Sequence, residues 1–252
     1  MEFEALPTKS TAMRSLALLS FLLFCIALSG YPQHDIHGDG SDVTVIRNIT
    51  SFDKLHNSIS AQVTVVRGDT YQVKIEGEKN VIDALATDVK DGELGIHFPF
   101  LRNIRMTRKL LVTVTTPGEL SEVANSGSGG IRTDGLFKSA AMRVRNSGSG
   151  VIELELRTDQ LDMSMSGSGN IRVKGRAKQL ECNISGSGNI RGDDLAIDEH
   201  SQIHVSGSGS CTITTNGVID GRISGSGGIN YSGNPSEVNV THSGSGRAHR
   251  IS

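Results

Sequence analysis

The stretch Met165–Ile190, MSGSGNIRVKGRAKQLECNISGSGNI, contains the hexapeptide SGSGNI twice, at Ser166–Ile171 and again at Ser185–Ile190. The tetrapeptide SGSG occurs seven times in the chain, at intervals of 18 to 21 residues. The motifs begin at Ser126, Ser147, Ser166, Ser185, Ser206, Ser224 and Ser243. A flexible Gly/Ser linker has no reason to keep such a period, so the motif indicates a structural repeat.

Two columns of residues, almost wholly apolar, accompany the motifs, five positions after the first Ser and three positions before it. The first column is Ile131, Ile152, Ile171, Ile190, Cys211, Ile229 and Ala248, and the second is Val123, Val144, Met163, Cys182, Ile203, Gly221 and Val240. The residues next to the first column are polar, as Arg172 and Arg191 illustrate. Alternation with period two predicts strands with one buried face.

A repeat of about twenty residues with short strands and one glycine-rich corner is typical of a parallel β-helix. One coil cannot bury its apolar positions alone, so successive coils stack and the Ile column becomes an internal ladder. We expect the corner glycines to supply positive φ or to leave no Cβ where the chain turns. A leucine-rich repeat is excluded because no Leu-x-x-Leu-x-Leu pattern recurs. The sequence therefore predicts an all-β solenoid over residues 125–252.

Composition and charge limit the class of partner. The 252 residues carry a net charge of −2, which gives no electrostatic footprint for nucleic acid. Four residues before successive motifs stand Glu122, Arg143, Asp162 and Glu181. We expect these charges of both signs to lie on a solvated face, where each ion pair contributes little.

The N-terminus has the pattern of a secretory signal. Arg14 precedes the apolar run Leu16–Leu28, which is short for a membrane span, and Ala27 to Ser29 offer small residues for cleavage before Gly30. We predict a signal peptide over residues 1–29, with Met1 or Met13 as the start. Cys25 follows Phe24 instead of a small residue, which argues against a lipoprotein. We expect an exported protein of the periplasm or cell surface, with no transmembrane segment in the mature chain.

Residues 30–124 do not contain the SGSG repeat. We expect residues 30–40 to be a flexible lead-in, in which His34, His37 and Asp39 are not expected to bind a metal. Residues 41–124 are predicted to form irregular first coils and a cap over the N-terminal end of the solenoid. Strands are expected over 43–49, 59–66, 71–76, 93–97 and 110–115. A short helix over 81–87 is expected, with Asn80 as its N-cap.

The order of these segments along the chain resembles that of a bacterial protein family. The segments FDKLHNSISAQVTVVRGDTYQVKIEGEKNVIDALATDVKDGELGI and LLVTVTTPGEL, followed by recurrent GSGNI, are similar to the head GIN domain, described as an autotransporter adhesin head. The resemblance covers residues 45–229, and Gly228-Ile229-Asn230 spells the motif. It implies a secreted right-handed β-helix with a role at the cell surface or in adhesion.

Candidate catalytic groups are few. Asp162 with Glu181, and Glu155 with Asp193 across Lys174, place carboxylates in stacked columns, as in some polysaccharide-cleaving β-helices. Neither pair has an aromatic platform for a sugar, so we interpret both as structural. His200 and His204 form no HExxH motif, and Arg191-Gly192-Asp193 is only a tripeptide match at a strand end. We predict no catalytic, cofactor or metal site.

Cys182 and Cys211 occupy different columns and therefore different strands of the predicted core. A disulfide requires Cα atoms within about 7 Å. The sequence favours two buried thiols that act as small apolar fillers.

Taken together, these features predict a secreted, non-enzymatic protein of the cell envelope that binds a glycan or an envelope protein, as an adhesin does. A structural or assembly protein of the periplasm is the alternative, and a polysaccharide-active enzyme is the third.

Overall fold

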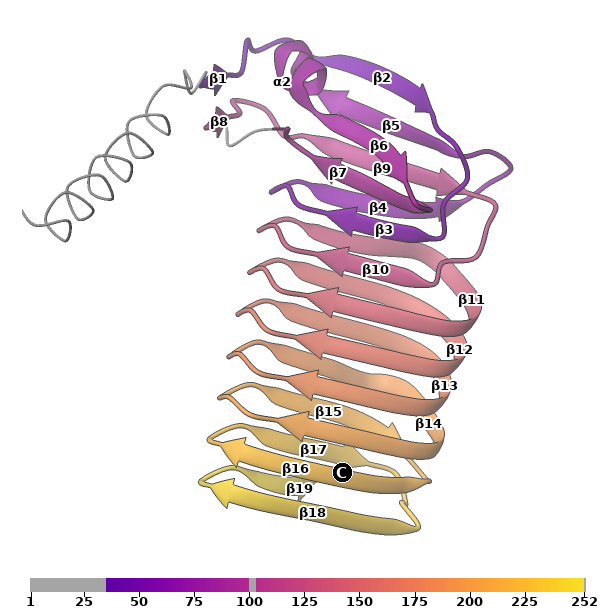
Figure 1. Cartoon of the computed structure of the whole chain (residues 1–252), viewed down its shortest axis with the longest axis vertical. Helices are drawn as coiled ribbons and strands as arrows, with labels where there is room; N and C mark the ends of the chain where they lie inside the picture. The colour runs from indigo at the N-terminus through magenta and orange to yellow at the C-terminus, as the bar shows by residue number, and fades with distance from the viewer. Residues whose placement is uncertain (1–34, 100–102, 252) are drawn as a thin grey trace, which may run out of the picture.

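The computed structural model describes residues 35–99 and 103–251, so the predicted signal peptide lies outside the described residues. The chain forms an all-β solenoid of about 7 turns with coils about 19 residues apart. In Figure 1 the strands nearest the viewer run to the left and those behind run to the right as the chain descends, which makes the coil right-handed. The predicted parallel β-helix is confirmed.

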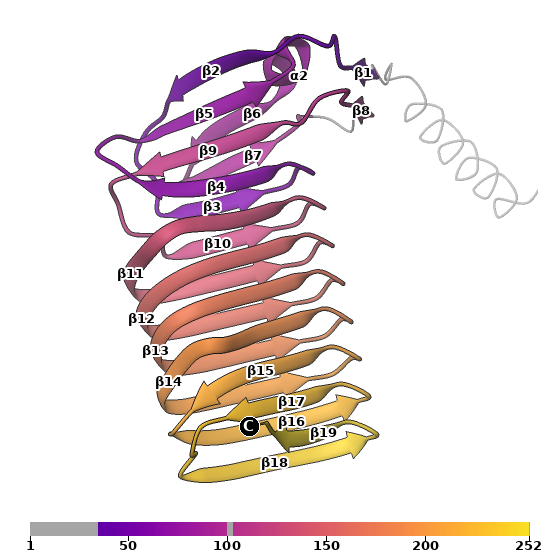
Figure 2. The ribbon, with the colours of Figure 1, turned by 180° about the vertical axis from the view of Figure 1, so that it is seen from behind.

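Each coil contributes to two parallel sheets, which Figures 1 and 2 show from opposite sides. We call the sheet built from residues before each SGSG corner the front sheet and the one built after it the back sheet. Four long strands bend from the back sheet into the front sheet: β11 (Gly130–Asn146), β12 (Val151–Met165), β13 (Asn170–Ile184) and β14 (Asn189–Val205). The last coils use β15 (Ser210–Thr215), β16 (Val218–Gly225), β17 (Gly228–Ser232), β18 (Glu237–Gly244) and β19 (Arg247–Arg250).

The register of the strands aligns the predicted columns. Ile171 pairs with Ile152 on one side and with Ile190 on the other, and all three side chains are fully buried. Val144, Met163 and Cys182 stack in the same way in the front sheet. Both ladders lie between the two sheets and form one continuous core.

The corner glycines are required because successive corners approach closely. A Cβ on Gly186 would lie 2.3 Å from the carbonyl oxygen of Gly167 in the preceding coil, although the φ of Gly186 is not positive. Only the corners at Gly225 and Gly244 have glycines with positive φ among the SGSG motifs. The expected positive φ is therefore wrong at the central corners, where a missing Cβ is the reason for glycine.

The first coil of the solenoid lies within residues 41–124, where irregular first coils were predicted, but its short strand over Lys54–Asn57 was not predicted. Strands β3 (Lys54–Asn57) and β4 (Gln62–Arg67) stack directly on β10 (Glu122–Asn125) and β11. Their corner, Ser58–Ala61, carries Ile59 and Ala61 where later corners carry glycine. Each corner Cβ points toward the preceding coil, and no SGSG coil precedes this one, so side chains fit there.

The N-terminal end is covered by an antiparallel cap. Strands β2 (Val43–Asn48), β5 (Gln72–Gly77) and β9 (Leu111–Thr116) extend the back sheet, and β6 (Ala86–Lys90) and β7 (Glu93–His97) extend the front sheet. Helix α2 (Lys79–Ala84) buries Val81 and Ile82 against this end. The helix begins earlier than predicted: Glu78 is its N-cap, and Asn80 instead donates a hydrogen bond to the His37 carbonyl.

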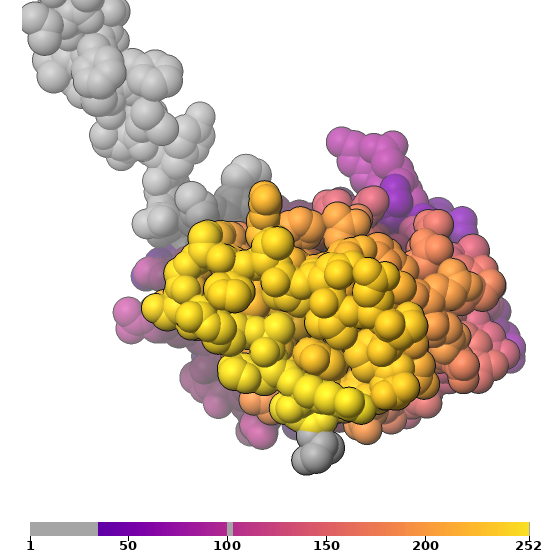
Figure 3. Space-filling model, turned by 90° about the horizontal axis from the view of Figure 1, so that it is seen from below, coloured from indigo at the N-terminus to yellow at the C-terminus, as the bar shows by residue number. Residues whose placement is uncertain are grey.

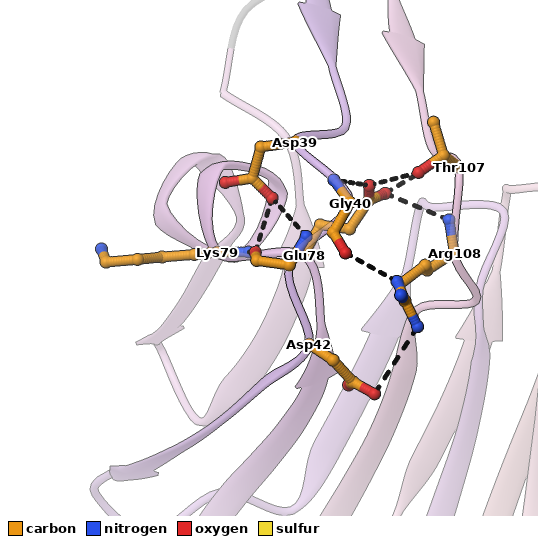
Figure 4. A network of polar contacts seen from close by, with 8 residues as sticks. Asp39, Gly40, Asp42, Glu78, Lys79, Thr107 and Arg108 are labelled. Atoms are coloured by element: carbon orange, nitrogen blue, oxygen red, sulfur yellow. Dashed lines mark hydrogen bonds and ion pairs between the residues drawn. The ribbon is translucent and has the colours of Figure 1, made fainter.

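The segment expected as a lead-in makes specific contacts from Ile36 on. Strand β1 (Ile36–His37) pairs with β8 (Ile104–Arg105). Figure 4 shows the carboxylate of Glu78 between two loops. It accepts hydrogen bonds from the backbone N–H of Gly40 at 2.8 Å and from the N–H and hydroxyl of Thr107 at 2.9 and 2.6 Å. The Thr107 hydroxyl is the main reason that the pKa of Glu78 lies below its usual value.

The opposite end of the described solenoid is formed by the last coil, which Figure 3 views along the axis. Strands β18 and β19 pair only with β16 and β17, and most side chains of β18 are exposed. Across residues 35–99 and 103–251, no helix has the length and apolar character needed to span a membrane.

Candidate functional site

The front sheet has a shallow hollow of about 540 Å³ beside the SGSG corners, which we call the corner groove. One wall is the outward column two residues before each corner, and the other is the first Ser of each corner. These residues are His56, Ala124, Arg145, Ser164, Asn183 and His204, with Ser126, Ser147, Ser166, Ser185 and Ser206. The alternation of each strand turns this column outward while its neighbours enter the core.

The floor of the corner groove is the buried column just before each corner. Toward the N-terminal end it is an amide ladder: Asn57 donates to Asn125 at 2.9 Å, and Asn125 donates to Asn146 at 3.2 Å. In later coils Met165 and Ile184 take this place, so the floor becomes apolar. Buried amides that satisfy one another hold the first corners in register, since an unpaired buried amide costs about 1–3 kcal/mol.

The walls present hydroxyl, amide and imidazole groups at successive levels. Adjacent levels are about 4.8 Å apart, the spacing of hydrogen-bonded strands. The Nδ1 atom of His204 is buried and lacks a hydrogen-bond partner among the described residues. A buried nitrogen without a hydrogen-bond partner destabilises the folded protein unless water or a ligand supplies that partner. The groove is therefore suited to a long polar molecule that lies along the solenoid axis.

At the N-terminal end of the groove, His56 connects residues from three adjacent strands of the front sheet, β7, β3 and the strand that leads into the corner at Ser126. Its Nε2 lies 3.0 Å from the Ser126 hydroxyl, and its Nδ1 lies 3.6 Å from Glu93 Oε1. The order of the three groups matches that of a Ser-His-acid triad. The side chains of His56 and Glu93 are 37% and 45% exposed, so water competes for both contacts. This arrangement fits hydrogen bonding to a ligand better than activation of the serine.

The predicted ladder of charges lies next to the corner groove and is internally paired. Arg143 reaches Glu122 at 3.6 Å and Asp162 at 3.1 Å. The hydrogen bond that Arg143 donates to Asp162 is the main cause that raises the pKa of Arg143. Asp162 also stacks beside Glu181, as predicted, but Glu181 accepts a hydrogen bond from Asn183. Neighbouring side chains form hydrogen bonds or ion pairs with these carboxylates, which therefore do not face a common substrate position.

The other sequence candidates are dispersed. Glu155 pairs with Lys174 at 2.9 Å on the back sheet, and this contact raises the pKa of Lys174. Arg191-Gly192-Asp193 lies within β14, where Gly192 is buried. His200 contacts Asp220 at 2.7 Å, away from the groove in which His204 lies. In the described part of the chain, no three His, Cys, Asp or Glu side chains gather as metal ligands would.

Most of the chain matches a known protein family. Residues 51–235 match the family described as "Putative auto-transporter adhesin, head GIN domain". The chain belongs to the head GIN domain family. The match begins beside the first coil, near Phe52, and ends beyond β17, so it includes most of the cap and of the solenoid. The resemblance seen in the sequence is confirmed. No functionally curated protein matches the chain.

Solved structures share this fold. An adhesin-like protein of Bacteroides fragilis, described as "a putative adhesin", has 21% identity and a TM-score of 0.81, with 86% of this chain and 100% of that chain covered. A "Putative lipid binding protein" of Parabacteroides distasonis has 24% identity and a TM-score of 0.72, with 87% and 100% covered. A "putative adhesin" of Parabacteroides merdae has 21% identity and a TM-score of 0.66, with 86% and 99% covered. At these identities the likeness shows the fold alone.

Proposed function

We propose that this chain is an exported, non-enzymatic binding protein of the bacterial cell envelope that holds an extended glycan along the corner groove. One observation carries the proposal: hydroxyl, amide and imidazole groups recur at successive coils beside a common floor. The adhesin description of the family supports a role in binding at the cell surface.

The chemistry of the groove favours a glycan over other polymers. A peptide that adds a strand needs a free sheet edge, whereas the groove lies on a sheet face and offers only side chains. A nucleic acid needs a run of positive charge, but Arg145 in the groove is paired with Glu122 at 3.5 Å. A glycan is bound by many neutral hydrogen bonds, which the Ser, Asn and His side chains supply.

Binding to defined polysaccharides tests the proposal with two matched pairs of variants. Asn183→Ala and His204→Ala remove groove side chains, whereas Asn230→Ala and His249→Ala remove the same chemistry from the outward column of the back sheet. We expect each groove variant to weaken binding about fivefold to tenfold, the loss of one hydrogen bond. The back-sheet variants should stay within about twofold of the unmodified protein.

Equal losses from groove and back-sheet variants would reject the corner groove as the binding site. If the unmodified protein binds none of the polysaccharides, the result would favour the alternative, a structural or assembly protein of the periplasm. Export is tested separately: the mature N-terminus is expected at Gly30 or Tyr31, and an intact mass of all 252 residues in the cytoplasm would contradict it.

The contacts of His56 with Ser126 and with Glu93 favour ester hydrolysis as a second candidate. A fluorophosphonate probe reacts covalently with an activated serine, so it reports the chemistry without a known substrate. We expect no labelling, because His56 and its partner Glu93 are both exposed to water. Labelling that disappears in the Ser126→Ala variant would assign a hydrolytic site to the groove.

A further inference from the structure

The two cysteines of the described chain face each other across the core. Cys182 lies in the front sheet on β13, and Cys211 lies in the back sheet on β15. Both side chains are fully buried, as predicted. Their Sγ atoms are nevertheless only 3.2 Å apart. The two columns meet between the sheets, so separate strands do not keep the sulfurs apart.

We propose that Cys182 and Cys211 form a disulfide that joins the front and back sheets of the mature protein. The inference rests on the proposed export, because disulfides persist in oxidising compartments. The sulfurs need to approach by about 1 Å to reach a bond length of about 2.05 Å. Since both thiols are enclosed by apolar side chains, no competing partner holds either of them in place.

The bond would enclose all of β14 and two SGSG corners. Cys182 and Cys211 are 29 residues apart, and the segment between them contains Ser185–Gly188, β14 and Ser206–Gly209. A crosslink over such a loop restricts the unfolded chain and ties three successive coils together. It would lie in the C-terminal half of the solenoid, opposite the end that the cap covers.

The reaction is an exchange with a disulfide oxidant, such as oxidised glutathione. A cysteine thiolate attacks the oxidant and releases one glutathione thiol, and the second cysteine then displaces the other. Two protons and two electrons leave the cysteine pair, and the oxidant becomes two thiols. The Cys211 contact and burial raise the pKa of the Cys182 thiol well above its usual value. The thiolate is therefore scarce in the closed core, and we expect the bond to form while β13–β15 are still assembling.

Thiol labelling of the full chain tests the proposal. In a Cys25→Ser background, the protein is exported from a bacterial host, denatured without reductant and treated with a maleimide. We expect no label before reduction and two labels after it. Cys182→Ala and Cys211→Ala should each give one label without reductant, since the remaining thiol has no partner. The oxidised protein should melt roughly 5–10 °C above the reduced protein.

Refolding of the purified chain with oxidised glutathione tests the geometry of the cysteine pair. This test requires neither export nor the single-cysteine variants. Two labels after this refolding would overturn the proposal. Two labels on the exported protein would also overturn it, even if the bond forms on refolding. Glycan binding by the groove variants is read independently, so failure of the disulfide does not count against the proposed function.

Discussion

At the scale of single residues, burial in the solenoid changes from one position to the next. Ile190 is fully buried between Ile171 and Cys211, whereas Arg191 beside it is exposed. Ile190→Asp would place a carboxylate without a partner in an apolar ladder, and we expect it to lower the free energy of unfolding by several kcal/mol. Arg191→Asp should cost less than about 1 kcal/mol. Urea denaturation of both variants measures the difference, and equal midpoints would reject the register.

The corner glycines give a second prediction at this scale. Gly186→Ala would bring a Cβ to 2.3 Å from the Gly167 carbonyl, and the stacked backbones cannot separate without breaking adjacent ladder bonds. We expect a loss of about 1–3 kcal/mol in the free energy of unfolding. Gly95→Ala is the matched control, because its nearest atom lies at 3.4 Å and its φ is not positive. A similar loss in both variants would contradict close approach as the reason for glycine.

The two apolar columns could be predicted because every coil repeats the same environment. Twenty-residue periodicity and period-two alternation together fix which residue of each coil enters the core. The distance between Cys182 and Cys211 could not be predicted in this way, since it depends on how the front and back sheets pack against each other. Periodicity within one sheet carries no information on that packing.

At the scale of elements, the cap depends on one carboxylate. Glu78 is 2% exposed and accepts hydrogen bonds from the loops at Gly40 and Thr107. Its folded pKa is below the usual value of 4.5, so its contribution to stability is present above that pH and is lost as the pH falls through the folded pKa. We expect the melting temperature of the unmodified protein to fall on acidification below about pH 4.5.

The Glu78→Gln variant should show a smaller acid dependence and a lower melting temperature at neutral pH. An amide supplies one acceptor oxygen where the carboxylate supplies two, so some N–H groups of the loops lose their partner. Glu119→Gln, at an exposed position, is the control and should follow the unmodified protein. Parallel pH curves for Glu78→Gln and the unmodified protein would show that another group sets the acid limit.

The cap was predicted only in part, for a physical reason. Apolar and polar residues alternate regularly in its longer strands, and the strand predicted over 93–97 coincides with β7. The start of α2 was misplaced because Glu78 is an unusual N-cap whose side chain bonds to distant loops instead of to the helix. The first coil was predicted only as an irregular one, and its strand β3 was missed because its corner needs no glycine, although Asn57-Ser58 repeats Asn125-Ser126. The corner groove combines outward residues from coils that only the register aligns.

At the scale of the whole molecule, each coil is stabilised mainly by its two neighbours. The coils of β12 and β13 are covered on both sides, and their inward residues are almost completely buried. The last coil has a neighbour on one side only in the described chain, so Val240 and Ala248 of the two ladders stay partly exposed. We therefore expect backbone hydrogen exchange to be slowest in β12–β13 and fastest in β18–β19.

Hydrogen exchange followed by mass spectrometry measures this gradient on the intact protein. The cap sets the direction of the gradient, because α2 and the antiparallel strands cover the N-terminal end and leave the coil of β3 and β4 enclosed. Protection of β3 and β4 should therefore approach that of β12–β13. The Glu78→Gln variant should speed exchange in β2 and β5 while β13 keeps its rate, since nearest-neighbour coupling decays along the solenoid. Uniform exchange along the chain would contradict this, because it would make the solenoid one cooperative unit whose end coils open only when the central coils open.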